Sequence, residues 1–249
     1  MIEKIKGVAL SRIKVSQNIP LGYRWKYRAR IRKAILLSYQ LADILEVEPN
    51  SEVITDFCFL IPLVDIEQDT TGKKVTPEDI DKCLTQKIDQ NWCKLLREIN
   101  SKIKSKSFIQ AIKKVAYYQN LPVEPVTKQH LEEITFGKGG YTGLAFLYLL
   151  KPNLSYSPKE EKAFYDLGKL LQTSDDYQDR KKDALEGYTT LFTEGFWGLT
   201  DLDNLRKKVM AEFYESYDKN KVRLLDYSFR LYIFASSGRF LSTFSDVLF

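Results

Sequence analysis

The chain has 249 residues, of which 44% are hydrophobic, and a formal net charge of +5, so it can bury one sizeable core or two small ones. No apolar run approaches the roughly 18 residues of a membrane span, and the first residues lack the hydrophobic block of a signal peptide, which predicts a cytoplasmic protein without a transmembrane segment. Three cysteines without Cys-x-x-Cys spacing and a single histidine argue against a disulfide framework and a Cys/His zinc site. Any metal must therefore be held by oxygen.

The dominant period of the sequence is helical. Apolar residues recur at three- and four-residue steps, and strand signals are scarce. The predicted helices span residues 28–46, 53–68, 78–103, 108–118, 128–150, 158–186, 201–217 and 219–247. The breaks between them are short and contain no linker or repeat. We therefore expect an all-α protein, a single domain over residues 1–249 built as an antiparallel helical bundle.

Two of the predicted helices carry explicit start signals. Thr76 and Ser157 each offer an N-cap hydroxyl, followed by a proline and by an acidic residue three positions past the cap. Gly187 is a natural stop for the helix that follows Ser157, because glycine is the preferred residue just past a helix end. The long helix over 158–186 is thus bounded on both sides by local signals.

A basic run near the N-terminus, YRWKYRARIRKA, contains six cationic residues among aromatic side chains. Such a run could bind nucleic acid or an anionic membrane. Its alternating and fourth-residue spacings are more typical of a solvated helix face, and nothing nearby resembles a nucleic-acid-binding module. We therefore expect no nucleic-acid partner; a salt-dependent binding assay would reveal one.

Three aspartates at four-residue steps, Asp175, Asp179 and Asp183, follow an apolar stretch in the helix expected over 158–186. At about 100° per residue they continue the stripe that begins with Phe164, which predicts an acidic column on the core face. Like charges on such a face repel one another and resist desolvation unless cations lie among them. Magnesium, which takes oxygen ligands from carboxylates and phosphates, is the expected cation.

A second acidic column lies upstream in ITDFCFLIPLVDIEQD. There Ile54, Phe57 and Ile61 form a helical stripe that Asp65 and Asp69 continue at four-residue steps. Either acidic run could instead be a solvated helix end, as most Asp-rich stretches are. Two such helices facing each other would surround a metal cluster at the mouth of an apolar cavity.

These stretches resemble the class I isoprenoid (terpenoid) synthase superfamily. LGKLLQTSDDYQD is similar to the second aspartate motif of trans-prenyl diphosphate synthases, and residues 175–183 match the bacterial terpene-cyclase pattern Asn-Asp-x-x-Ser-x-x-Lys-Glu with Asp at all three metal sites. LVDIEQD is similar to the first Asp-x-x-x-Asp motif of squalene and phytoene synthases. FGKGGYTG lies where the prenyl synthases keep a Lys-Thr pair that grips diphosphate. The resemblance covers residues 54–190.

The resemblance implies an isoprenoid synthase fold around a central apolar cavity and Mg²⁺-dependent ionisation of an allylic polyprenyl diphosphate. The catalytic carboxylates, which would hold a cluster of up to three Mg²⁺ ions, are Asp65, Asp69, Asp175, Asp179 and Asp183. Lys182, close to the second column, would help the metals to neutralise the leaving diphosphate. The residues expected to bind the substrate are Lys138, Lys182, Arg239, Phe57 and Tyr141. A homodimer is left open.

Several functions within this superfamily stay open. The favoured one is a terpene synthase (cyclase) that releases diphosphate from a single substrate. A chain-elongating prenyltransferase needs a second, basic diphosphate pocket, and only Lys73 and Lys74 follow the first motif. A condensing enzyme of the squalene and phytoene synthase type is the other catalytic alternative. A non-catalytic subunit of such an enzyme would have no need of five metal aspartates and Lys182.

Overall fold

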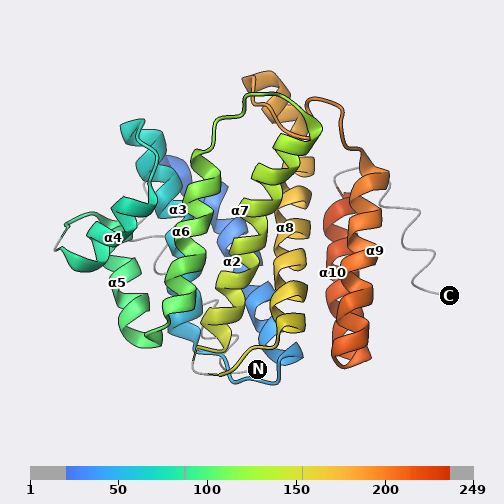
Figure 1. Ribbon diagram of the computed structural model, residues 1–249, viewed down its shortest axis with the longest axis horizontal. Coiled ribbons are helices and arrows are strands. Elements are labelled where there is room, and N and C mark those ends of the chain that lie inside the picture. Colours follow the sequence, from blue (N-terminus) through green and yellow to red (C-terminus); the bar gives the residue numbers. More distant parts are fainter. Residues whose placement is uncertain (1–20, 87, 153, 236–249) are drawn as a thin grey trace. The chain divides into compact units, whose positions relative to one another are not determined.

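The computed structural model describes residues 21–86, 88–152 and 154–235, and its regular secondary structure there is entirely helical (Figure 1). The all-α prediction is therefore confirmed. The nine helices within these ranges are α2 (Leu21–Ile44), α3 (Ser51–Thr71), α4 (Pro77–Thr85), α5 (Asn91–Ile103), α6 (Lys106–Asn120), α7 (Lys128–Leu150), α8 (Pro158–Glu186), α9 (Leu199–Ser216) and α10 (Lys219–Ala235). Over the described ranges, no helix has both the length and the apolar character needed to cross a membrane.

The helices group into two compact units. Unit 1 comprises residues 1–120 and 145–156, and unit 2 comprises residues 121–144 and 157–249. Within unit 1, α3 packs against α2 and α5, and α4 packs against α5 and α6. Within unit 2, α9 packs against both α8 and α10. The first predicted acidic column thus belongs to unit 1 and the second to unit 2; the single domain stays a prediction.

Both predicted capping boxes are present. The Thr76 hydroxyl accepts a hydrogen bond from the Asp79 backbone N–H at 3.2 Å, and the Asp79 carboxylate accepts one from the Thr76 backbone N–H at 3.1 Å. Ser157 and Glu160 make the same reciprocal pair at the start of α8. Gly187 ends α8 with a φ of 76°, in the left-handed region that favours glycine. Local signals therefore placed both ends of α8 correctly.

The single helix predicted over residues 78–103 is in fact two helices, α4 and α5. The residues between them include neither proline nor glycine, so the sequence carries no breaker. The break is stabilised by Arg97, whose guanidinium donates hydrogen bonds of 2.9–3.2 Å to main-chain carbonyl oxygens. The accepting residues are Cys83, Gln86 and Ile88. A side chain from the next helix thus satisfies carbonyl groups that a continuous helix would have satisfied internally.

The same break brings Cys83 and Cys93 together in a disulfide, with their Cα atoms 5.2 Å apart. The odd number and the spacing of the cysteines had argued against disulfides, and for this pair that expectation is wrong. The reason is tertiary, because α5 folds back onto α4 and brings two fully buried sulfur atoms together. Cys58 is left as a free buried thiol, and its burial raises its pKa to about 12.

We expect reduction of the Cys83–Cys93 bond to lower the free energy of unfolding by about 2–3 kcal/mol, because the bond closes a short loop in the unfolded chain. Urea unfolding with and without reductant measures the change. In a Cys83→Ser/Cys93→Ser variant, reductant should have no further effect. An unfolding midpoint of the wild type that does not move in reductant would contradict this contribution.

Candidate functional site

Glycine residues let α7 and α8 pack with their backbones in contact within unit 2. A Cβ atom added to Gly139 would lie 2.5 Å from the carbonyl oxygen of Gly168. Cβ atoms on Gly143 and Gly168 would overlap main-chain atoms of Phe164 and Gly139, respectively. No larger residue fits without moving a backbone. The FGKGGYTG stretch is therefore a helix-packing seam, and it brings Lys138 alongside α8.

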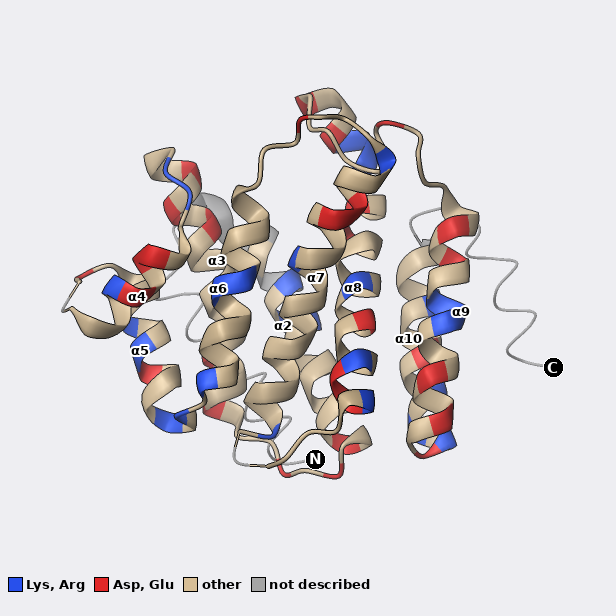
Figure 2. Cartoon of the chain, in the orientation of Figure 1, with Lys and Arg blue, Asp and Glu red and all other residues tan. Residues whose placement is uncertain are grey.

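The three aspartates of α8, called the α8 column below, share one face because α8 is uninterrupted. All three of Asp175, Asp179 and Asp183 are half-buried, whereas the neighbouring Thr173 and Tyr177 are buried and form the core face. Figure 2 shows acidic and basic bands alternating along α8. The sequence had predicted a column on the core face; the structure places it at the border of the core instead. At this border desolvation costs the carboxylates less.

Electrostatic repulsion is concentrated at the C-terminal end of the column. Burial, followed by the charge of Asp179, raises the pKa of Asp183, while Lys182 opposes the shift. Lys182 is exposed and forms an ion pair of 3.3 Å with Glu186. The hydrogen bond that Lys182 donates to Glu186 is the main reason why the pKa of Lys182 is raised, with smaller contributions from the charges of Asp179 and Asp183. Lys182 is thus within electrostatic range of the column, as predicted, but its partner is Glu186.

Asp176, which the sequence analysis did not include among the site residues, has the most perturbed carboxyl group of this face. Burial raises the pKa of Asp176 to about 7, against the opposing effects of Lys138 and of a 2.7 Å hydrogen bond from the Gln172 amide. The predicted phosphate-binding Lys138 therefore lies near Asp176. A carboxyl group with such a pKa can exchange a proton at neutral pH.

The raised pKa of Asp176 predicts a pH dependence of stability. The protonated Asp176 stabilises the folded protein fully below about pH 4, and this stabilisation is lost as the pH rises through about 7, where the half-buried carboxyl group must ionise. We expect Asp176→Asn to be more stable than the wild type at pH 8, by on the order of 2 kcal/mol, and to match it at pH 4. This value lies below the full linkage energy because the side chain is only half-buried.

Urea unfolding of the metal-free proteins at the two pH values measures this difference. Glu98→Gln, which neutralises an exposed carboxylate on α5, is the matched control and should show no such gain. Equal stabilities of Asp176→Asn and the wild type at pH 8 would contradict the prediction.

α10 also reaches the α8 column. The Tyr232 hydroxyl donates a hydrogen bond of 3.1 Å to Asp175 Oδ1, and the Gln178 amide donates one of 2.7 Å to the Tyr232 carbonyl oxygen. This contact could not be predicted from the sequence, because Tyr232 follows Asp175 by 57 positions, on a helix whose period gives no sign of it.

The acidic column of α3 differs from its prediction. Phe57 is buried, but Ile61 is 43% exposed, Asp65 is half-buried and Asp69 is exposed. The stripe therefore leaves the core at Ile61, and the neighbouring Pro62 is the last buried residue of α3. Asp69 lies at a solvated helix end, which was the alternative interpretation of this run.

Side-chain amides hold this end of α3 within unit 1. Gln90 Nε2 donates to Glu67 Oε1 and Gln119 Nε2 donates to Gln68 Oε1, each at 3.0 Å. The segment that carries Asp65 is thus attached to the chain ahead of α5 and to α6. Sequence spacing could not have revealed either contact.

The remaining predicted substrate residues have packing roles in the structure. Phe57 forms edge-to-face contacts with Phe108 and Phe146 at centroid distances of 5.6 and 4.9 Å, deep in unit 1. Tyr141 packs in the same way against Tyr165 in unit 2, at 5.4 Å. Contact of these rings with a substrate stays a prediction. Arg239 lies outside the described residues.

The predicted Mg²⁺ ligands divide between the units, with Asp65 and Asp69 in unit 1 and the α8 column in unit 2. Across the part of the chain that the structure describes, no three His, Cys, Asp or Glu side chains form a group that could hold a metal ion. The donor chemistry of the α8 column does fit Mg²⁺, since its oxygens are carboxylates and a cation would relieve the repulsion at Asp183. Because its members are about 6 Å apart along the helix, an ion would need side-chain movement or phosphate oxygens to complete its coordination.

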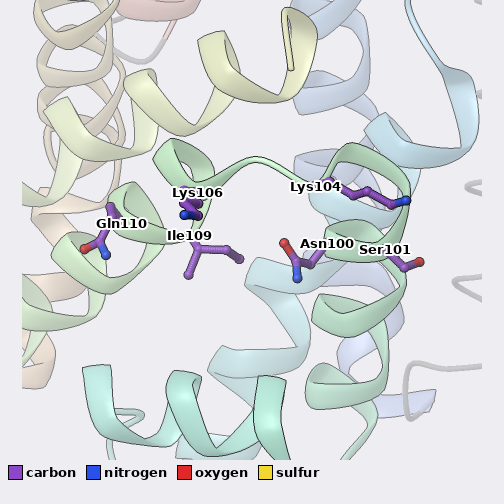
Figure 3. Close-up of a pocket in the computed structure, with 6 residues that line it drawn as sticks. All are labelled: Asn100, Ser101, Lys104, Lys106, Ile109 and Gln110. Carbon is purple, nitrogen blue, oxygen red and sulfur yellow. The ribbon is translucent and has the colours of Figure 1, made fainter. Parts of the chain in front are cut away.

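A pocket of about 430 Å³ lies in unit 1, at the junction between α5 and α6 (Figure 3). Figure 3 shows Lys104 and Gln110 on opposite sides of it, with Asn100 and Ile109 between them. The residues that line it are Asn100, Ser101, Lys104, Lys106, Ile109 and Gln110. None of them belongs to either acidic column. The central apolar cavity implied by the resemblance stays a prediction.

No protein-family model, curated protein or solved structure matches the chain. The features of this chain that point to a function are therefore its own side chains, above all the α8 column and the residues that surround it.

Proposed function

We propose that the protein ionises an allylic prenyl diphosphate in a Mg²⁺-dependent reaction and releases diphosphate, as a terpene synthase does. The observation that carries this proposal is the half-buried α8 column. Repulsion between its carboxylates contributes to the raised pKa of Asp183, and Lys182 and Lys138 lie close by. Carboxylates in this arrangement favour a divalent cation over an empty site. Lysine side chains beside them suit a ligand that carries phosphate oxygens.

Each side chain has a role that its surroundings support. Mg²⁺, when bound, would withdraw negative charge from the diphosphate and so lower the barrier to its departure. Asp175, Asp179 and Asp183 would hold the ions through their carboxylate oxygens. Lys182, held at the rim of the column by Glu186, would add positive charge there. Asp65 and Asp69 of unit 1 stay predicted ligands.

The reaction breaks the bond between the allylic carbon and the diphosphate oxygen. The electron pair leaves with the diphosphate, and the carbon becomes an allylic cation. Lys138, which lies near Asp176 on the packed seam of α7 and α8, would bind the departing phosphate oxygens. The ring face of Tyr141, one turn further along α7, would stabilise the cation.

The test is incubation with allylic prenyl diphosphates of increasing chain length, in Mg²⁺ or in excess chelator, with measurement of released diphosphate and mass spectrometry of the products. We expect Mg²⁺-dependent release with formation of a hydrocarbon or an alcohol. Label from isopentenyl diphosphate in a longer product, or two joined allylic chains, would show a condensing prenyltransferase instead. No turnover of any substrate would contradict the enzymatic proposal and favour a non-catalytic subunit.

A further inference from the structure

The pocket at the junction between α5 and α6 lies in a segment of the chain without negative charge. Residues 99–123 contain five lysines and neither aspartate nor glutamate. One of these lysines, Lys102, pairs with Glu52 of α3 at 3.1 Å. Lys104 and Lys106, which both line the pocket, form no ion pair with any residue that the structure describes. The pocket therefore has two positive charges that the fold leaves unbalanced.

The rest of the pocket lining is mostly polar. The side-chain amides of Asn100 and Gln110 form no hydrogen bond within the described part of the chain, and Ile109 is the one apolar residue of the lining. Figure 3 shows Asn100 pointing from α5 towards Ile109 on α6. A volume of about 430 Å³ is in the range of small-molecule sites. A prenyl tail would meet a single apolar side chain here, so the lining suits a small polar anion instead.

The backbone of Lys104 is a second unusual feature of the pocket. Lys104 ends α5 with a φ of 48°, in the left-handed region where glycine is favoured and a residue with a Cβ is strained. Among the described residues other than glycine, only Glu46 also has a positive φ. Strained backbone of this kind is concentrated at binding and catalytic sites. The lysine at this position thus lowers stability and supplies a cation to the pocket.

We propose that this pocket binds a small molecule that carries a phosphate or diphosphate group. Lys106 and Lys104 bind the phosphate oxygens through charge-assisted hydrogen bonds, and the amides of Asn100 and Gln110 bind the polar remainder of the ligand. The Lys104 side chain extends away from Ile109 in Figure 3, and its flexible stem lets the ammonium group rotate onto a ligand. The pocket belongs to unit 1 and the α8 column to unit 2, so the inference does not depend on the proposed function.

The test is calorimetric titration with inorganic diphosphate in excess chelator, so that no divalent cation takes part. We expect the wild type to bind diphosphate, with an affinity that falls as the salt concentration rises. Lys104→Gly should bind about 10-fold more weakly. Its melting temperature should be no lower than that of the wild type, because glycine adopts the same φ without strain. A purely structural role of Lys104 would not combine weaker binding with unreduced stability.

Three further variants locate the bound diphosphate. Glu46→Gly relieves the same backbone conformation outside the pocket, and Lys208→Ala removes an exposed lysine of α9 in unit 2. Both should keep the affinity of the wild type. Lys182→Ala should also keep it, since Lys182 lies beside the α8 column and not in the pocket. Loss of binding in Lys182→Ala, with none in Lys104→Gly, would overturn the inference.

The double variant Lys104→Gly/Lys106→Ala removes both unbalanced charges, and we expect its affinity for diphosphate to be at least about 100-fold weaker than that of the wild type. Wild-type affinity in the double variant, or no binding by the wild type itself, would overturn the inference. If the double variant does not fold, Lys106→Gln replaces it, because this exposed side chain on the first turn of α6 can be changed without loss of packing. Unchanged affinity in Lys106→Gln would then overturn the inference.

Discussion

Replacement of Gly143 by alanine should destabilise the protein by about 3 kcal/mol, because the new Cβ would overlap the Phe164 carbonyl oxygen on α8. Backbone atoms cannot rotate away as a side chain does, so α7 and α8 must separate or the helices must deform. Gly168→Ala should act in the same way, since its Cβ would meet the Gly139 carbonyl oxygen. Urea unfolding followed by circular dichroism measures both losses.

Gly198→Ala is the matched control for these variants. A Cβ at Gly198 would have only Asp201 Oδ2 nearby, at 3.8 Å, which is an ordinary van der Waals contact. Its effect should be within about 1 kcal/mol, as for other changes at a helix N-cap. Gly143→Ala with the stability of the wild type would mean that α7 and α8 are not in backbone contact.

Asp179→Asn should reduce Mg²⁺-dependent release of diphosphate by at least about 100-fold, because it removes a carboxylate from the middle of the α8 column and with it the charge that holds the cation. The metal-free variant should fold and be at least as stable as the wild type, because the Asp179 charge that helps to raise the pKa of Asp183 is gone. Steady-state assays and thermal unfolding in chelator measure the two effects.

Asp89→Asn is the control for this substitution. Asp89 is an aspartate of unit 1 that forms an exposed ion pair of 2.6 Å with Lys94, and loss of such a surface pair has little effect on stability. Its turnover should equal that of the wild type. Full turnover by Asp179→Asn would show that the α8 column is not part of the active site, whatever reaction the protein catalyses.

Features that depend on neighbours within one or two helical turns could be predicted from the sequence. The ends of α8 were predicted correctly because the Ser157–Glu160 capping box and the Gly187 stop each involve residues at most a few positions apart. The shared face of the α8 column followed in the same way, since a helix of known bounds fixes the directions of residues four positions apart. The all-α class followed from the same period.

Only the tertiary structure decided which of these faces is buried and what each side chain meets there. The break between α4 and α5 depends on Arg97 reaching back to main-chain carbonyl groups and on the Cys83–Cys93 bond, and neither leaves a local signal. The loss of burial at Ile61 depends on where the unit 1 core ends. The raised pKa of Asp176 depends on its burial, and the contact of Tyr232 with Asp175 needs α10 to return beside α8. Periodicity gives the direction of a side chain about its own helix axis, but burial, pKa and hydrogen bonding depend on atoms from other helices, whose positions are set by packing.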